Sequence, residues 1–129
     1  MTEDRLSGLK VLIVEDESLV SMLIEDALAD LGCRVAGVAS RIDEALDKAA
    51  TLPLDAAILD VNLHGKQTAA VAEILKKRGV PFLFATGYGV SGLPGGFQTA
   101  PFLQKPFHEA DLERVLRQAL EFERDKSGR

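Results

Sequence analysis

Five short apolar runs alternate with helix-like segments along this chain of 129 residues. Runs of four to seven residues, bounded by Gly, Pro or polar residues, are typical of strands buried on both faces of a sheet. Strands that alternate with helical segments predict a parallel sheet with helices on both faces. The five runs are Val11–Val14, Cys33–Ala39, Ala56–Asp60, Pro81–Ala85 and Pro101–Gln104.

The composition of the runs predicts their order in the sheet. The first, third and fourth runs are the most apolar and are expected in the middle, whereas the second contains Gly37 and the fifth is brief, so both belong at edges. The predicted fold is a doubly wound α/β fold of the flavodoxin-like (βα)5 type, with strand order 2-1-3-4-5. One domain is expected over residues 1–129, with its core at about residues 9–123.

Four helices are expected between and after these strands. Ser18 and Ser40 are predicted to cap the first two, Thr68 to open the third, and the last to run from His108 to about Phe122, before a frayed tail at 124–129. On the first helix we expect Leu23 to face inward and Ser21 outward. Between Gly87 and Ala100 there are five glycines and Pro94, so any helix there should be short or marginal.

Polar residues follow four of the five strands. Glu15 and Asp16 come after the first and Asp60 ends the third, while Thr86 and Lys105 follow the fourth and fifth. In a parallel sheet these positions share one edge, which is where such folds bind ligands. Three carboxylates placed together repel one another unless a cation joins them, and oxygen ligands of this kind suit Mg²⁺. One of the carboxylates could then act as a nucleophile on a phosphoryl group, with Thr86 and Lys105 meeting the added charge.

With these residues the sequence resembles the receiver domain of two-component response regulators over nearly its whole length. The resemblance implies that Asp60 is the phosphoacceptor and that Glu15, Asp16, Asp60 and the backbone carbonyl of Asn62 hold Mg²⁺. It makes Thr86 the switch hydroxyl and Phe102 the aromatic switch residue. Lys105-Pro106-Phe107 matches the family's Lys-Pro-Phe motif, in which the peptide bond between the first two residues is typically cis.

Residues 81–88, with the sequence PFLFATGY, are similar to the PFxFATGY signature of a subgroup of receivers that are often stand-alone. Members of this subgroup are typically linked to HWE-type or related histidine kinases. Two departures from the family pattern stand out. His64 replaces a proline, which should loosen the loop expected at 63–67, and Phe102 lacks a tyrosine hydroxyl, so that a switch there would be steric.

These residues predict a single-domain response regulator with no output domain. A histidine kinase or a phosphotransfer protein would phosphorylate Asp60, and the new charge would draw in Thr86, order residues 87–100 and change what that face of the protein binds. Its signal would pass to a separate, unknown downstream protein. A phosphate sink for a shared kinase is the alternative, and nothing in the sequence separates the two.

Other functions fit the sequence less well. A phosphohydrolase with an aspartyl nucleophile would want a second Asp where Asn62 stands. A flavin-binding protein would want a Ser/Thr-rich phosphate loop after the first strand, where Glu15-Asp16-Glu17 would repel the phosphate. The module is therefore not expected to be a metabolic enzyme. The net charge of −5 and the longest basic run, 76–78, argue against nucleic acid. No apolar stretch is long enough to cross a membrane, so a cytoplasmic location is expected.

Overall fold

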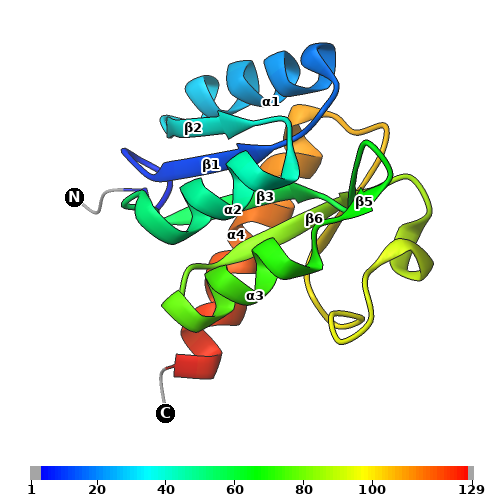
Figure 1. Cartoon of the computed structure of the whole chain (residues 1–129). Helices are drawn as coiled ribbons and strands as arrows, with labels where there is room; N and C mark the ends of the chain where they lie inside the picture. The colour runs from blue at the N-terminus through cyan, green and yellow to red at the C-terminus, as the bar shows by residue number, and fades with distance from the viewer. Residues whose placement is uncertain (1–3, 128–129) are drawn as a thin grey trace.

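The computed structural model describes residues 4–127, which form a five-stranded parallel sheet between two layers of helices (Figure 1). The strand order is β2-β1-β3-β6-β7. In order along the chain this is 2-1-3-4-5, so the predicted fold class and strand order are confirmed. The strands are β1 (Lys10–Val14), β2 (Arg34–Ala39), β3 (Ala56–Asp60), β6 (Phe82–Thr86) and β7 (Phe102–Gln104).

Each face of the sheet has its own hydrophobic core, because successive side chains of a strand point to opposite faces. Val11 and Ile13 of β1 pack with α1 (Ser18–Asp30) and α4 (Glu109–Ser127). Leu12 and Val14 pack on the other face with α2 (Ile42–Thr51) and α3 (Ala69–Arg78). The central strand β3 is buried along its whole length, which places Asp60 at the end of an entirely apolar strand. None of the helices in residues 4–127 is long and apolar enough to span a membrane.

The predicted serine caps are wrong. Helix α1 already includes Ser18, with Glu17 as its cap residue, and α2 begins at Ile42 after Arg41. Neither cap residue makes a side-chain cap bond. At the start of α2, the Ser40 amide instead donates to the Glu44 carboxylate at 3.1 Å, so a side chain one turn along binds the backbone just before the helix. The predictions for α3 hold, since Thr68 precedes it and Gly79, with φ of 71°, ends it.

The buried face of α1 differs from the prediction at two positions. Ser21 is buried, and its hydroxyl donates to Glu25 at 3.1 Å, so burial leaves no polar group unpaired. Leu23 is 63% exposed and lies with Leu19 and Met22 in an apolar surface patch on the helix. Apolar residues lie on more than one side of this helix, and periodicity alone therefore did not identify the side that packs.

Helix α4 is longer than predicted. It runs to Ser127, through residues 124–127 that were expected to be frayed, and residues 128–129 of the predicted tail lie outside the described residues. The sequence after residue 121 contains Glu, Arg and Lys, which favour helices, and Gly and Pro are absent up to residue 127.

Residues 87–100 contain one turn of 3₁₀ helix, η1 (Gly89–Gly92), and no α-helix, which confirms the prediction from the glycine content. Leu93 and Phe97 of this segment are nevertheless buried in the core beside α3. The Phe97 ring packs edge-on against Phe82 and Phe84, with centroids 5.9 and 5.7 Å away. Side-chain burial therefore holds the segment in place without regular backbone hydrogen bonds.

The loop expected at 63–67 is a small β-hairpin. Strands β4 (Asn62–Leu63) and β5 (Lys66–Gln67) pair antiparallel around the two-residue turn His64-Gly65. Both turn residues have positive φ, 49° for His64 and 83° for Gly65, which matches the twist of short hairpins. His64 therefore lies in a hairpin turn, and its loosening effect on this part of the chain stays a prediction.

Candidate functional site

Glu15, Asp16 and Asp60 meet at the carboxyl edge of the sheet and are called the acidic cluster below. Glu15 and Asp16 directly follow β1, and Asp60 ends the neighbouring β3. One oxygen from each of the three side chains lies within 4.8 Å of the other two. Glu15 is 2% and Asp60 8% exposed, so two of the three carboxylates are removed from bulk water.

Lys105 brings a positive charge to the acidic cluster. Its Nζ lies 3.1 Å from Oε1 of Glu15 and 3.3 Å from Oδ2 of Asp60. The residue directly follows the edge strand β7, and its backbone amide donates to the Thr86 carbonyl at 2.8 Å. The peptide bond between Lys105 and Pro106 is cis, the geometry that the resemblance implies.

Burial dominates the protonation of Glu15. Loss of solvent, followed by repulsion from Asp60, raises the pKa of its carboxyl to about 7 despite the ion pair with Lys105. Burial acts to lower the pKa of Lys105, but attraction to Asp60 and Glu15 outweighs this and the pKa is raised. Near neutral pH the site thus holds a charged lysine and more carboxylates than that single charge can balance.

The β4–β5 hairpin positions the outer part of the acidic cluster. The backbone amide of His64 donates to Oδ2 of Asp16 at 2.9 Å, and the Asn62 amide donates to Oδ1 of Asp60 at 3.3 Å. The Asn62 side chain accepts from the Gly65 amide at 2.7 Å, which closes the turn. The contact of His64 with Asp16 was not predicted. The adjoining glycine at a two-residue turn was the signal that could have indicated a hairpin.

Thr68 holds the backbone of Asp60 in place by a hydrogen bond. The sequence predicted only that Thr68 opens a helix. It is fully buried, and its hydroxyl donates to the backbone carbonyl of Asp60 at 2.7 Å. This bond ties the start of α3 to the end of β3. A buried threonine eight residues after the carboxylate carries no motif of its own, so only the three-dimensional structure reveals the contact.

Thr86 is fully buried at the end of β6, next to β3. Its hydroxyl accepts a hydrogen bond from the Tyr88 amide at 3.0 Å, and this amide is its partner among the described residues. Phe102, the other predicted switch residue, is half-buried at the start of β7. The structure thus places Thr86 beside the acidic cluster and Phe102 farther back along the edge strand.

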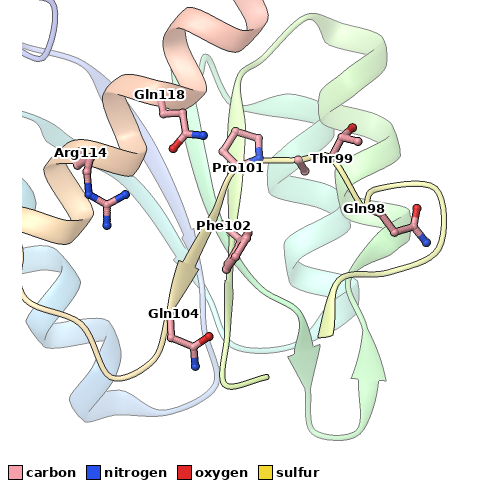
Figure 2. Close-up of a pocket in the computed structure, with 8 residues that line it drawn as sticks. Gln98, Thr99, Pro101, Phe102, Gln104, Arg114 and Gln118 are labelled. Atoms are coloured by element: carbon pink, nitrogen blue, oxygen red, sulfur yellow. The ribbon is translucent and has the colours of Figure 1, made fainter. Parts of the chain in front are cut away.

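A pocket of about 460 Å³ lies beside Phe102, between the edge strand and α4 (Figure 2). Gln104 from β7, Arg114 and Gln118 from α4, and Gln98 and Thr99 from the preceding segment line it with polar groups. The pocket is separate from the acidic cluster, and its lining residues are suited to contacts with another molecule's polar groups.

The acidic cluster has the chemistry of a magnesium site. Its three donors are carboxylate oxygens, the type of ligand that Mg²⁺ prefers, and histidine and cysteine take no part in the cluster identified among the described residues. Burial and repulsion from Asp60 raise the pKa of Glu15, and a bound divalent cation would offset that repulsion. The donor set therefore fits Mg²⁺ held by Glu15, Asp16 and Asp60.

Residues 11–117 match the family model of the response regulator receiver domain. The chain is 36% identical over 118 residues to the phyllosphere-induced regulator PhyR of Methylorubrum extorquens, covering 88% of this chain and 44% of that protein. It is 32% identical over 107 residues to the transcriptional regulatory protein PdtaR of Mycobacterium tuberculosis, covering 80% of this chain and 52% of that one. The chain thus spans about half or less of the length of these curated relatives.

Several solved structures are matched by this chain over nearly their full length. The solution structure of SdrG from Sphingomonas melonis matches with a TM-score of 0.79 and 39% identity, covering 88% of this chain and 97% of that chain. The receiver domain of PhyR from Erythrobacter litoralis matches with a TM-score of 0.78 and 33% identity, covering 92% and 95%. The BeF3-activated conformation of SdrG gives a TM-score of 0.74 at 40% identity, covering 88% and 98%.

Proposed function

The chain belongs to the response regulator receiver family, and from this premise we propose that Asp60 accepts a phosphoryl group from a histidine kinase or a phosphotransfer protein. The observation that carries the proposal is the acidic cluster with Lys105 at the carboxyl edge of the sheet. Asp60 ends a fully buried strand there and is 8% exposed, so its side chain is held at the lip of the sheet.

In the proposed reaction, a carboxylate oxygen of Asp60 forms a new bond to phosphorus as the P–N bond of a phosphohistidine breaks. The electron pair of that bond stays on the imidazole nitrogen, which takes up a proton from water. A bound Mg²⁺ supplies positive charge that offsets the negative phosphoryl oxygens. Lys105, with its Nζ 3.3 Å from Asp60, stabilises the charge that the acyl phosphate adds.

The proposed response of the protein starts at Thr86. Its hydroxyl can donate a hydrogen bond to a phosphoryl oxygen on the neighbouring strand, and we propose that it turns from the Tyr88 amide to do so. Phe102 and the pocket in Figure 2 lie next along the edge strand, and this face is where we place contact with a downstream protein. Leu93 and Phe97 are buried before any phosphorylation and hold the second half of residues 87–100. We therefore propose that phosphorylation orders only the first half of this segment.

We also propose that the chain acts as a single-domain regulator in the cytoplasm, and that its phosphoryl donor is an HWE-type or related kinase. The solved SdrG chain is matched over 97% of its length, so that chain too consists of little more than a receiver domain. The apolar patch on α1, formed by Leu19, Met22 and Leu23, starts one turn beyond Asp16. Its position suits contact with the protein that presents the phosphohistidine.

Intact mass after incubation with acetyl phosphate and Mg²⁺ tests the proposed phosphoacceptor. The wild-type protein should gain about 80 Da, the mass of one phosphoryl group. Asp60→Asn should gain nothing, and neither should wild type treated with EDTA. Asp55→Asn is the matched control, because Asp55 is a surface aspartate that binds the Lys10 amide, and it should behave like wild type.

An adduct that persists in Asp60→Asn would refute Asp60 as the acceptor. An adduct that persists in EDTA would refute the proposed role of the metal. The α1 patch is tested separately with Leu23→Glu. This variant should react normally with acetyl phosphate, which needs no docking surface, and slowly with a phosphorylated histidine phosphotransfer domain.

A further inference from the structure

Gly92, the last residue of η1, lies directly against the side chain of Thr86. A Cβ atom added to Gly92 would overlap Oγ1 of Thr86, and would lie 3.3 Å from Cβ of Tyr88 and 3.5 Å from Cβ of Thr86. The backbone of Gly92 is outside the left-handed region, so an alanine could adopt its φ and ψ angles. The Thr86 hydroxyl is therefore what excludes a side chain at position 92.

Thr86 is held in this conformer by its neighbours in the turn. The hydroxyl accepts the Tyr88 amide at 3.0 Å and fills the space that a side chain on Gly92 would occupy. The residue is fully buried and β-branched, so its side chain has few staggered positions to choose from. A conformer that turned the hydroxyl from Gly92 would break the bond from Tyr88 and vacate the space beside η1.

We infer that Gly92 is a positioning residue whose missing side chain allows the Thr86 hydroxyl to remain bonded to Tyr88 in the unphosphorylated protein. The role of Gly92 in holding the hydroxyl does not depend on the proposed function. Only one further step rests on that function, namely that the hydroxyl, once turned from Tyr88, faces a phosphoryl group on Asp60. The coupling works in both directions. When the hydroxyl turns away, η1 gains room to move inward. Such a movement would shift two exposed side chains, those of Val90 within η1 and Tyr88 directly before it.

Gly92→Ala separates the two conformers without any phosphoryl donor. The added methyl group cannot coexist with the hydroxyl in its present place, so Thr86 should adopt the other rotamer. Gly95→Ala is the matched control in the same segment, because a Cβ there meets nothing within 4 Å and the backbone is again outside the left-handed region. In Thr86→Ala/Gly92→Ala the overlapping oxygen is gone, and the methyl group should be accommodated.

The measurement is the χ1 angle of Thr86 from three-bond scalar couplings in labelled protein, together with the Tyr88 amide proton shift. We expect a new χ1 and an upfield Tyr88 amide in Gly92→Ala, and wild-type values in Gly95→Ala. Adding Ala at 92 to Thr86→Ala should leave the Tyr88 amide unchanged. With Mg²⁺ present, the beryllofluoride concentration that gives half-saturation should be about tenfold lower for Gly92→Ala than for wild type, if the turned conformer makes up about a tenth of the wild-type population. The apparent affinity is reduced by the fraction of protein in the binding conformer.

An unchanged χ1 in Gly92→Ala would overturn the inference, because η1 would then have yielded in place of the hydroxyl. The inference is equally overturned if Gly95→Ala produces the same changes, or if Ala at 92 still moves the Tyr88 amide when Thr86 is Ala. Failure of the proposed function is seen differently, as a wild-type protein whose spectrum does not respond to beryllofluoride. The rotamer result would decide the role of Gly92 in either case.

Discussion

An ion pair of the acidic cluster and one near the N-terminus are similarly short but differ in their exposure to water. In the acidic cluster, Lys105 Nζ lies 3.1 Å from Glu15, and the two side chains are 21% and 1% exposed. In the N-terminal ion pair, Arg117 Nη2 lies 2.9 Å from Asp4, and the side chains are 42% and 49% exposed. Both join a carboxylate to a basic side chain at hydrogen-bonding distance, so distance alone would give them the same role.

The two carboxyl groups nevertheless shift their pKa in opposite directions. Hydrogen bonds from Arg117 lower the pKa of Asp4 to about 2, whereas burial and repulsion from Asp60 raise the pKa of Glu15 to about 7. At Asp4, water solvates the negative charge, and the hydrogen bonds from Arg117 stabilise that charge further. At Glu15, water is largely excluded, and the single charge of Lys105 is shared between Glu15 and Asp60. It does not make up for the lost solvation of Glu15. Burial in the acidic cluster therefore disfavours the charged carboxylates, a cost that a bound cation would offset.

Removal of the lysine should have the largest effect on stability. Lys105→Met leaves Glu15 and Asp60 without a cation, and we expect a loss of about 2 to 4 kcal/mol in the free energy of unfolding at about pH 8. Urea unfolding measures the loss, which should shrink at about pH 5.5 because Glu15 is then protonated. Lys48→Met removes the half-exposed partner of Glu44 and should cost less than about 0.5 kcal/mol. Equal losses in the two variants would refute the contrast.

The pH dependence of stability should be the next largest effect. The folded pKa of Glu15 lies above its usual value of 4.5, at about 7, so the folded state holds a proton that the unfolded chain has lost. Stability contributed by Glu15 should therefore fall as pH rises from 4.5 to about 7, by about 1 to 3 kcal/mol without metal. Glu15→Gln should remove this slope. A wild-type slope that survives in the variant would assign the titration to another group.

Magnesium should act in the opposite sense at the same residues. At about pH 8, Mg²⁺ at a hundred times its dissociation constant should stabilise the wild type by about 2.7 kcal/mol, the gain expected for one site. The slope between pH 4.5 and 7 should flatten as well, since the cation favours charged Glu15. Thermal unfolding with Mg²⁺ and with EDTA measures both. Asp4→Asn should respond to Mg²⁺ like wild type, and Glu15→Gln should respond weakly.

The N-terminal ion pair should show the smallest effect. Asp4→Asn should lower stability only slightly above pH 3.8, and the two proteins should converge as the pH falls to about 2, where Asp4 takes up its proton in the folded state. Salt at about 1 M should remove most of the difference, since the pair is exposed. Carbon NMR titration of the Asp4 carboxyl checks the cause directly. A midpoint at the usual 3.8 would mean that Arg117 does not hold this carboxylate in solution.

Much of the site could be predicted because it depends on strand ends. The sequence placed Glu15, Asp16, Asp60, Thr86 and Lys105 after predicted strands, and the parallel topology brings such positions to one edge. Their roles in phosphorylation stay predictions until they are tested. The contacts of His64 and Thr68 could not be predicted. The first joins a turn to a residue 48 positions earlier, and the second depends on how the start of a helix packs against the end of the preceding strand.

The sequence by itself determined the fold class, the strand order and the lack of an α-helix at 87–100, because hydrophobic runs, glycines and prolines act locally. Only the tertiary structure decided the buried side of α1, the contact of the β4–β5 hairpin with Asp16 and the burial of Leu93 and Phe97. It also decided that Gly92 meets the Thr86 hydroxyl. The physical reason is that packing and desolvation depend on which distant groups become neighbours. The same kind of ion pair therefore lowers one pKa at the surface, while burial raises another in the interior.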